Sequence, residues 1–326
     1  MVSDAVYERN IMVEEQLGVK MEMCPAEGDT FVNTKFDNDI MGGAGEFDII
    51  VNGTFMAVLP AMEGKYVNLS GLTNIDTSKH YWTQGNNDMM TFTDEHMQFL
   101  ASGSTAISMF RYMYLTIYNK TLFEAYKLPD LYETVKSGKW TLDYQYSIVQ
   151  NHYADKDGNG EASEGDFYGF VTGNVVSVDP YMVSSNIHMI VKDSDTEDLM
   201  YNTDAIDDLS ALCDKIQKLY HDESTYVYNG AEKDNVGQSY ITQHFAGGNA
   251  LMATIMFLNM ETNYEDLGSL TYGIAPLPKF AEYQTEYYSY VQNIVSCFGI
   301  STVVSDSARQ EMCAAVLDPW LIIATV

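Results

Sequence analysis

The alternation of hydrophobic and polar positions is clearest just before the dipeptide Asn119-Lys120. Every second residue from Met113 to Ile117 is Met, Leu or Ile, and the residues between and beside them are tyrosine and threonine. A β-branched and aromatic run of period two predicts a β-strand, which Asn119-Lys120 ends. Thr141 then predicts the start of a helix, because its hydroxyl can accept an otherwise unpaired backbone N–H.

Helical and strand patterns alternate along the rest of the chain, which indicates an α/β fold. Residues 204–220 place apolar side chains at helical spacing, with acids early and lysines late, as the helix dipole favours. We also predict strands over Val19–Met23 and Phe47–Val51 and a short helix over Asn38–Met41. Ligands of α/β sheets lie beyond the carboxyl ends of strands. Asn52 and Thr54 are therefore candidate ligand residues, although a simple Asn-Gly turn explains the same sequence.

Length and charge narrow the class of protein. A chain of 326 residues can bury a substantial core and usually forms two domains. Its 46 acidic and 17 basic residues give a formal charge of −29, which would repel phosphate backbones and anionic lipids. We therefore expect no nucleic-acid partner. The 24 tyrosines fit a wet binding surface, but also buried, hydrogen-bonded tyrosine.

The cysteine spacing and the apolar runs do not indicate a function. Four widely separated cysteines, none in a Cys-x-x-Cys motif, predict neither a zinc ribbon nor a thioredoxin site. No apolar run reaches the roughly 20 residues of a membrane-spanning helix, and the N-terminus lacks the features of a signal peptide. Taken alone, these features indicate a cytoplasmic protein with no direct membrane insertion.

The segment from Ile117 to Asp143 resembles a known family. A Tyr-Asn-Lys run from Tyr118 ends a strand, a helix follows over Leu122–Tyr126, and Trp140-Thr141 opens the next helix. This order resembles the family 1 extracellular solute-binding proteins, the maltodextrin-binding-protein-like receptors of bacterial ABC sugar importers. Further similar segments, at residues 245–252 and 272–279, extend the resemblance from about residue 4 to residue 318.

The resemblance implies a periplasmic-binding-protein-like type II α/β fold, with two lobes joined by a hinge and a ligand cleft between them. The first lobe would comprise residues 1–110 and 280–326, and the second would comprise residues 111–279. Both ends look truncated beside the family, whose members place a signal peptide, a lipidated cysteine and a first strand before this point. The full-length form would then be an extracellular, cell-surface lipoprotein.

The function that the resemblance implies is that of a monomeric receptor, not an enzyme. It would capture a carbohydrate, an oligosaccharide by comparison with maltodextrin receptors, by hinge closure and deliver it to an ABC transporter permease. Polar side chains would bind the sugar hydroxyls while aromatic rings cover the apolar faces. The comparison assigns the binding residues Asn52, Thr54, Arg111, Tyr112, Tyr181, and Met256 or Phe257.

Trp82 and Trp140 have different predicted roles. Trp82 is a further candidate for sugar binding on chemical grounds alone, because Tyr81-Trp82 lies in a polar stretch. Trp140 is better explained as a packing residue beside the start of a helix than as a platform for a sugar.

A calcium motif stands independently of the resemblance. Residues 155–166 fit the EF-hand loop, with acids or amides at positions 1, 3, 5 and 12 and glycine at position 6. The expected ligands of a structural Ca²⁺ are Asp155, Asp157, Asn159, the Glu161 carbonyl, Ser163 through water, and Asp166. Aspartate replaces the usual bidentate glutamate at position 12, which predicts a lower affinity or a smaller coordination shell. An acidic surface turn without metal is the alternative.

Two other classes of protein remain open at this stage. The sequence has no Gly-x-Ser-x-Gly, P-loop or His-Glu-x-x-His motif. A calcium-stabilised secreted carbohydrate enzyme would nevertheless share the acidity and the EF-hand-like loop, and a pair of catalytic carboxylates is a spatial feature. A truncated remnant that binds nothing is the second alternative.

Overall fold

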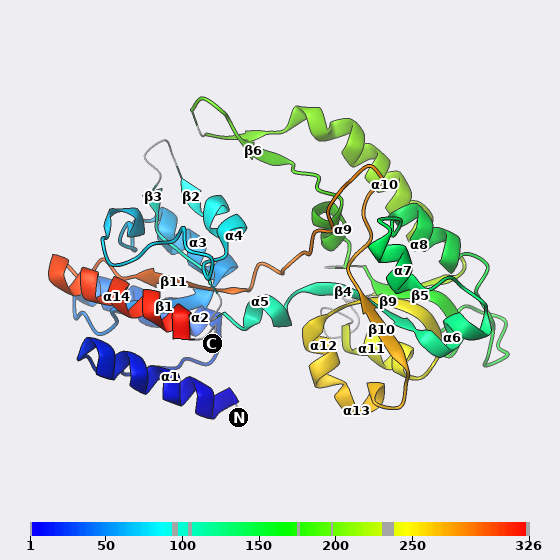
Figure 1. The fold of residues 1–326 in the computed structure, drawn as a ribbon, viewed down its shortest axis with the longest axis horizontal. Coiled ribbons are helices and arrows are strands. Elements are labelled where there is room, and N and C mark those ends of the chain that lie inside the picture. The colour runs from blue at the N-terminus through cyan, green and yellow to red at the C-terminus, as the bar shows by residue number, and fades with distance from the viewer. Residues whose placement is uncertain are drawn as a thin grey trace. The chain divides into compact units, whose positions relative to one another are not determined.

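The computed structural model describes residues 2–92, 97–103, 106–174, 177–196, 198–229 and 238–323 (Figure 1). The chain forms two compact units. Unit 1 comprises residues 1–109, 192–199 and 293–326, and unit 2 comprises residues 110–191 and 200–292. The chain first passes from unit 1 to unit 2 between residues 109 and 110, one residue before the expected boundary. Residues 280–292 pack with unit 2 rather than with the first lobe.

The side chains of residues 280–292 show why this segment belongs to unit 2 and not to the first lobe. Phe280 is buried in a cluster with Leu142 and Tyr181 of unit 2. The Tyr287 hydroxyl donates to the Val135 carbonyl oxygen at 3.1 Å. Residues 192–199 belong with unit 1, where Lys192 Nζ donates to the backbone oxygens of Asp88 and Thr91.

Unit 1 is built on an antiparallel pair of strands, β1 (Ile49–Gly53) and β11 (Ser296–Ile300). On its other side β11 forms isolated bridges at Ala101 and, one residue beyond its end, between Ser301 and Tyr66. The core contains Phe36, Trp82 and Phe298. The remaining elements of unit 1 are α1 (Val2–Leu17), α2 (Asp29–Gly42), α3 (Thr54–Met62), η1 (Leu69–Gly71), α4 (Gln84–Met89), β2 (Thr91–Phe92), β3 (Met97–Gln98) and α14 (Ser307–Ile323).

The local signals in unit 1 are confirmed for its helices but not for one strand. Gly18 follows α1 with φ of 65°, and Gly43 caps α2 with φ of 60°, the left-handed conformation that suits glycine after a helix. Asn38–Met41 is the last part of the longer α2. Val19–Met23, which we expected to be a strand, has no strand ladder.

Unit 2 contains a five-stranded sheet in the order β10-β4-β9-β5-β8. Its strands are β4 (Tyr114–Asn119), β5 (Tyr168–Gly173), β8 (Thr225–Tyr228), β9 (Ala250–Met256) and β10 (Tyr272–Ala275). β4 is antiparallel to β9 and β10, whereas β5 is parallel to β8 and β9. The strand predicted before Asn119-Lys120 is therefore confirmed as a central strand.

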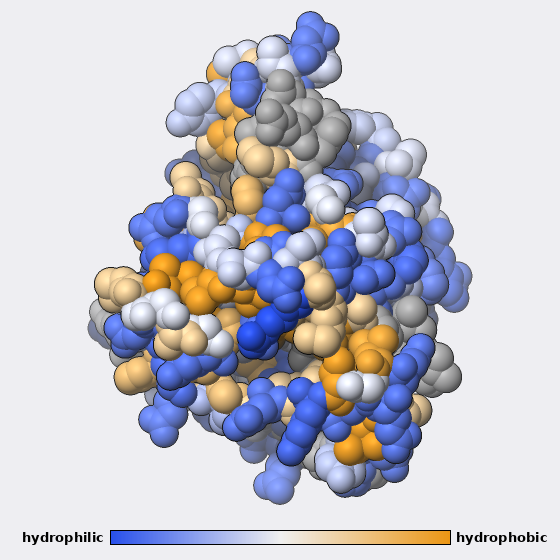
Figure 2. Space-filling view, turned by 90° about the vertical axis from the view of Figure 1, so that its left-hand side faces the viewer, coloured by the Kyte–Doolittle hydropathy of each residue, from blue (hydrophilic) through white to orange (hydrophobic). Residues whose placement is uncertain are grey.

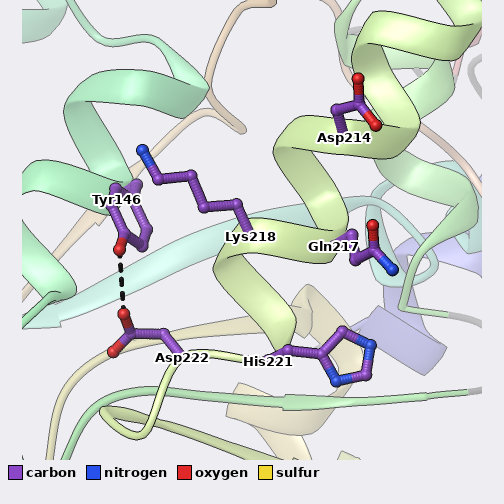
Figure 3. Close-up of a pocket in the computed structure, with 6 residues that line it drawn as sticks. All are labelled: Tyr146, Asp214, Gln217, Lys218, His221 and Asp222. Carbon is purple, nitrogen blue, oxygen red and sulfur yellow. Dashed lines mark hydrogen bonds between the residues drawn. The ribbon is translucent and has the colours of Figure 1, made fainter.

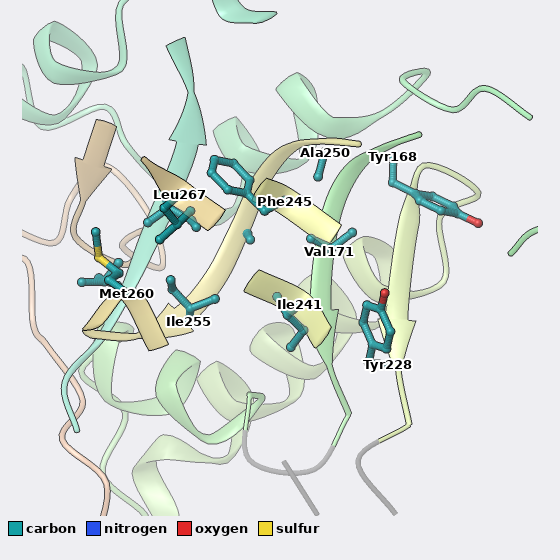
Figure 4. Packing of buried hydrophobic residues seen from close by; sticks show 12 residues of the cluster. Tyr168, Val171, Tyr228, Ile241, Phe245, Ala250, Ile255, Met260 and Leu267 are labelled. Carbon is teal, nitrogen blue, oxygen red and sulfur yellow. The ribbon is translucent and has the colours of Figure 1, made fainter. Parts of the chain in front are cut away.

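Helices cover both faces of this sheet. One face packs against α11 (Gln238–Ala246), α12 (Phe257–Thr262) and α13 (Tyr264–Leu267), as Figure 4 shows for the side chains around Phe245. The other face packs against α6 (Lys120–Ala125), α7 (Leu131–Lys136), α8 (Leu142–Val149) and α10 (Ile206–Tyr220). Further elements are α5 (Ser108–Arg111), α9 (Asp179–Ser184), β6 (Ile190–Lys192), β7 (Leu199–Tyr201) and η2 (Thr203–Ala205).

Caps and packing of the segment from Ile117 to Asp143 follow the sequence. The Asn119 side chain accepts from the Leu122 N–H, and Thr141 accepts from the Tyr144 N–H. Trp140 is completely buried, and its Nε1 donates to the Pro276 carbonyl oxygen at 2.8 Å. The packing role assigned to Trp140 is therefore confirmed.

Candidate functional site

The turn from β1 into α3 holds the two binding residues expected near Asn52. The Asn52 side chain is 4% exposed, and its Nδ2 donates to the Asp29 carbonyl oxygen and to Asn33 Oδ1. Its Oδ1 accepts from the Gly53 N–H at 2.8 Å. The half-buried Thr54 donates its hydroxyl proton to the Val295 carbonyl oxygen. Both side chains therefore stabilise the turn within unit 1.

Two aromatic residues expected to touch ligand are core residues instead. Trp82 is 1% exposed, and its Nε1 donates to Asp318 Oδ1 at 3.3 Å. Tyr181 is completely buried, and its hydroxyl is hydrogen-bonded to Thr254 Oγ1 at 3.1 Å. The structure corrects both assignments, because a ring surrounded by core side chains has no face left for a sugar.

The other expected residues meet at one edge of the unit 2 sheet. Tyr114, the first residue of β4, pairs with Met256, the last residue of β9, and the Phe257 N–H donates to the Met113 carbonyl oxygen. This pairing brings Tyr112 close to the start of α12. Phe257 is 40% exposed, whereas Met256 is 6% exposed. Of these two alternatives, only Phe257 presents a surface to solvent.

Charged groups lie beside these aromatic residues. Arg111 Nε donates to Glu261 Oε2 at 2.9 Å, and both side chains are partly exposed. Glu261 belongs to α12, so the ion pair ties this helix to the segment that leads into β4. A guanidinium and a carboxylate held together at a solvent-facing edge are groups that can hydrogen-bond to sugar hydroxyls.

Tyr290 also lies at this edge and was not expected from the sequence. Tyr290 is half-buried, its ring centroid lies 5.6 Å from that of Tyr114, and its carbonyl oxygen accepts from the Tyr114 N–H. Desolvation raises the pKa of Tyr290, and the negative charge of Asp179 raises it further. The negative charge of Asp179 also raises the pKa of Tyr114. The tyrosine-rich run at residues 287–290 was the available signal, but residues 280–326 were assigned to the other lobe.

The calcium-type loop brings three expected metal ligands together. Oxygen atoms of Asp155, Asp157 and Asp166 all lie within 4.8 Å of one another. Asp155 accepts from the N–H groups of Gly158 and Gly160, whose φ values are 71° and 79°. These two left-handed glycines allow the backbone to fold around the carboxylate.

The remaining expected ligands lie in the same loop. Asn159 Oδ1 accepts from the Glu161 N–H at 2.6 Å. Ser163 donates its hydroxyl proton to Asp157 Oδ2 at 2.8 Å. A Cβ atom added to Gly165 would lie 2.7 Å from the same Asp157 oxygen. Side-chain oxygen atoms therefore converge within a tightly folded loop.

Asp166 differs from the two exposed carboxylates because it is completely buried. Burial by itself raises the pKa of this carboxyl, but N–H groups of Ser163 and Lys156 and the Tyr153 hydroxyl donate to it, and the net direction is downward. Asp166 is therefore ionised at neutral pH. Ionised carboxylates and neutral oxygens are the ligands that Ca²⁺ prefers, so the residues present fit this ion.

A separate depression of ≈ 600 Å³ lies on the surface of unit 2 beside α10 (Figure 3). The Tyr146 hydroxyl donates to Asp222 Oδ2 at 3.0 Å, and Lys218 Nζ lies 4.2 Å from the centroid of the Tyr146 ring. Three of the lining groups thus interact with one another in the open depression, and we assign no ligand to it.

Comparison with known proteins defines the class of fold. Neither a family profile nor a curated relative matches the sequence. The structure, however, has the mixed α/β fold of the periplasmic-binding-protein-like type II class, matched over nearly the whole chain. The expected fold class is confirmed.

Three solved structures illustrate the likeness. M. tuberculosis UspC aligns with a TM-score of 0.63 at 12% identity, covering 99% of this chain and 76% of UspC. A sugar transporter from Rhizobium etli in an open conformation gives 0.62 at 14% identity, covering 96% and 71%. A cyclo/maltodextrin-binding protein complexed with maltotetraose gives 0.61 at 11% identity, covering 97% and 72%. At these identities the likeness establishes the fold.

None of the helices in the described residues combines the length and the apolar character that crossing a bilayer requires.

Proposed function

We propose that this chain is a substrate-binding receptor for a carbohydrate. The observation that carries the proposal is one edge of the unit 2 sheet, where Tyr112 and Tyr290 pack beside Tyr114 and Met256. The exposed Phe257 and the Arg111–Glu261 ion pair belong to the same edge. Aromatic faces beside a few polar groups are typical of sites that bind sugars. The fold, which is shared with solved sugar-binding proteins, supports the same function.

Each group has a distinct task in the proposed binding step. The rings of Phe257 and Tyr290 would cover apolar faces of the sugar, while the Asp179 carboxylate accepts hydrogen bonds from hydroxyl groups. The Arg111–Glu261 pair would supply a donor and an acceptor held in fixed geometry. Binding involves no covalent step, and its free energy would drive hinge closure, because a ligand favours the conformation that it binds more tightly.

The wider biological role follows from the same proposal. We take the ligand to be an oligosaccharide, which the chain would bind as a monomer and deliver to the permease subunits of an ABC transporter. The full-length protein would act outside the cytoplasm as a cell-surface lipoprotein. The maltotriose and maltotetraose bound in two of the similar structures support the choice of oligosaccharides as first ligands to test.

The loop at residues 155–166 is proposed to hold one structural Ca²⁺. Asp155, Asp157, Asn159 and Asp166 would supply side-chain oxygens, Glu161 a backbone oxygen, and Ser163 a contact through water. The ion would offset two of the three negative charges of the adjacent carboxylates and fix the loop that leads into β5. A structural role fits better than a sensor role, since extracellular calcium modules often work with dissociation constants of about 0.1 to 1 mM.

Isothermal titration calorimetry with malto-oligosaccharides and other neutral oligosaccharides tests the receptor function. We expect one class of glycan to bind, Tyr290→Ala and Asp179→Asn to weaken its affinity at least tenfold, and Tyr201→Ala, at a 76% exposed tyrosine elsewhere in unit 2, to leave it unchanged. Equal affinity in all four proteins would exclude the proposed edge. Binding of no glycan would count against the function itself.

A further inference from the structure

His244 is a titratable side chain in the interior of unit 2. Hydrophilic residues cover much of the molecular surface seen in Figure 2, but His244, in the last turn of α11, is only 6% exposed. A buried polar ring costs free energy unless its nitrogens are hydrogen-bonded. The partners of the two nitrogens therefore indicate what this residue does.

Each ring nitrogen of His244 lies at hydrogen-bond distance from another residue. Nε2 is 3.1 Å from the Asp166 carbonyl oxygen, and Nδ1 is 3.0 Å from the Tyr228 hydroxyl. A carbonyl oxygen can only accept, so Nε2 carries the proton and donates it. Nδ1 then accepts from the Tyr228 hydroxyl, and these two partners select a single tautomer.

The charge state of the ring agrees with this tautomer. Burial lowers the pKa of His244, and this effect exceeds the opposing effects of the Asp166 and Asn249 carbonyl oxygens and of the Glu164 and Asp166 carboxylates. The ring is therefore neutral at pH 7, which leaves Nδ1 free to accept.

Two tyrosines of the sheet pack against the histidine. The His244 ring centroid lies 5.7 Å from that of Tyr168 and 6.0 Å from that of Tyr228, and both tyrosines are drawn in Figure 4. Tyr168 also contacts the calcium-type loop, because its hydroxyl donates to the Ser163 carbonyl oxygen at 3.0 Å. Buried side chains thus hold the main-chain oxygens of Ser163 and Asp166. We call Tyr168, Tyr228 and His244 the aromatic anchor.

The two halves of the calcium-type loop differ in their support. Asp155 and Asp157 are exposed, and the hydrogen bonds to their carboxylates come from within the loop itself. Residues 163–166 are instead held to the core of unit 2 by the aromatic anchor. Asp166 occupies position 12, where its side chain is shorter than the usual glutamate, so its reach towards an ion depends on where its main chain is held.

We propose that the aromatic anchor sets the calcium affinity of the loop, with His244 as the positioning residue for Asp166. This proposal rests on the calcium site proposed above. The hydrogen bond from Nε2 holds the Asp166 main chain, so its carboxylate is directed towards Asp155 and Asp157 before an ion binds. A ligand that is already in place loses less conformational freedom on binding. Loss of a group that orients a metal ligand typically lowers metal affinity about 10- to 100-fold.

Terbium luminescence with calcium competition tests the proposal. Tb³⁺ takes oxygen ligands as Ca²⁺ does and emits when a nearby tyrosine absorbs, and Tyr153 lies 3.3 Å from Asp166 Oδ2. We expect His244→Leu to weaken the calcium affinity about tenfold or more. His244→Gln should stay within about threefold of wild type, because its Nε2 can donate to the same carbonyl oxygen.

Tyr228→Phe is a milder test that keeps the ring and removes only the hydroxyl that selects the tautomer. We expect a calcium affinity between those of wild type and His244→Leu, with far-UV circular dichroism unchanged. In the calcium-free protein, amide exchange at residues 163–166 should be faster in both variants than in wild type. Wild-type calcium affinity in Tyr228→Phe, or in a folded His244→Leu, would overturn the role of the aromatic anchor.

Thr254→Val is the matched control, because it removes a buried hydroxyl of the same sheet that is hydrogen-bonded to Tyr181 and not to the loop. It should lower the melting temperature of unit 2 and leave the calcium affinity unchanged. An equal loss of affinity in Thr254→Val would assign the effect to general stability and refute the positioning role. Absence of Tb³⁺ and Ca²⁺ binding in wild type would refute the calcium site itself, and the role of His244 with it.

Discussion

Neutralising one carboxylate of the calcium loop should have opposite effects on stability with and without calcium. Asp157 is the most informative position, because it is exposed and lies within 4.8 Å of oxygens from both Asp155 and Asp166. Asp157→Asn keeps an oxygen to accept from the Asn159 N–H. The substitution therefore removes a negative charge and an ionised ligand. It also replaces Oδ2, which accepts from Asn159 Nδ2 and Ser163 Oγ, with an amide N–H2 group.

The magnitude follows from the geometry. At 4.8 Å, two unit charges in a water-like dielectric repel each other by about 0.9 kcal/mol. Asp157 makes two such pairs, so relief of their repulsion contributes up to about 2 kcal/mol to the stability of calcium-free Asp157→Asn. The loss of the two exposed hydrogen bonds to Oδ2 offsets part of this gain. Extracellular calcium modules have dissociation constants of about 0.1 to 1 mM. A calcium concentration of about 100 times the dissociation constant adds about 2.7 kcal/mol, roughly 5 to 10 °C in melting temperature for a unit of this size.

Differential scanning calorimetry in EDTA and in 10 mM Ca²⁺, on the order of 100 times a 0.1 mM dissociation constant, measures both effects. Wild type should gain the full shift, whereas Asp157→Asn should gain less than half of it and melt at or above wild type in EDTA. Glu282→Gln, an exposed acid elsewhere in unit 2, is the control and should behave as wild type. A calcium shift that Asp157→Asn retains in full, or that Glu282→Gln also loses, would refute the assignment of the ion to this loop.

Three further predictions concern packing and titration. Gly169→Ala should destabilise unit 2 by about 3 kcal/mol or more in urea unfolding, because its Cβ would lie 2.3 Å from the Val149 carbonyl oxygen; Gly85→Ala, with nothing within 4 Å, should cost far less. Trp82→Phe should lower the stability of unit 1 without changing glycan affinity in calorimetry, because the ring is a core residue. Burial raises the pKa of Tyr181 from its ordinary value of 10.0 to about 12. The stability that this shift provides is therefore present below pH 10 and is lost as the pH rises towards 12, at about 1.4 kcal/mol per pH unit. Tyr181→Phe should reduce this alkaline loss of stability in urea titrations at pH 9 to 12.

The sequence was most informative where structure depends on neighbouring residues. The strand before Asn119, the helix stop at Gly18 and the caps at Asn119 and Thr141 all rest on contacts within a few positions. The EF-hand spacing is also local, so it correctly brought Asp155, Asp157 and Asp166 together. Such features need no knowledge of the rest of the chain, because one turn or one strand determines them.

The burial of individual aromatic residues could not be predicted from their neighbours in the sequence. Trp82 and Tyr181 both follow or lie in polar sequence, yet each is buried by segments distant along the chain, such as α14 around Asp318 and β9 around Thr254. Tyr290 shows the converse. Its tyrosine-rich neighbourhood was visible, but its position beside Tyr114 depends on which unit residues 280–292 join.

Val19–Met23 has the alternating side chains of a strand but no strand ladder in the described chain. Its alternating side chains predict a strand, yet a strand is completed only by a neighbour that accepts and donates its hydrogen bonds. β1 satisfies one edge through β11 and leaves the other without a pair in the described chain. The strand prediction is therefore incorrect for the described chain, because alternating side chains do not determine which backbone partner completes a ladder.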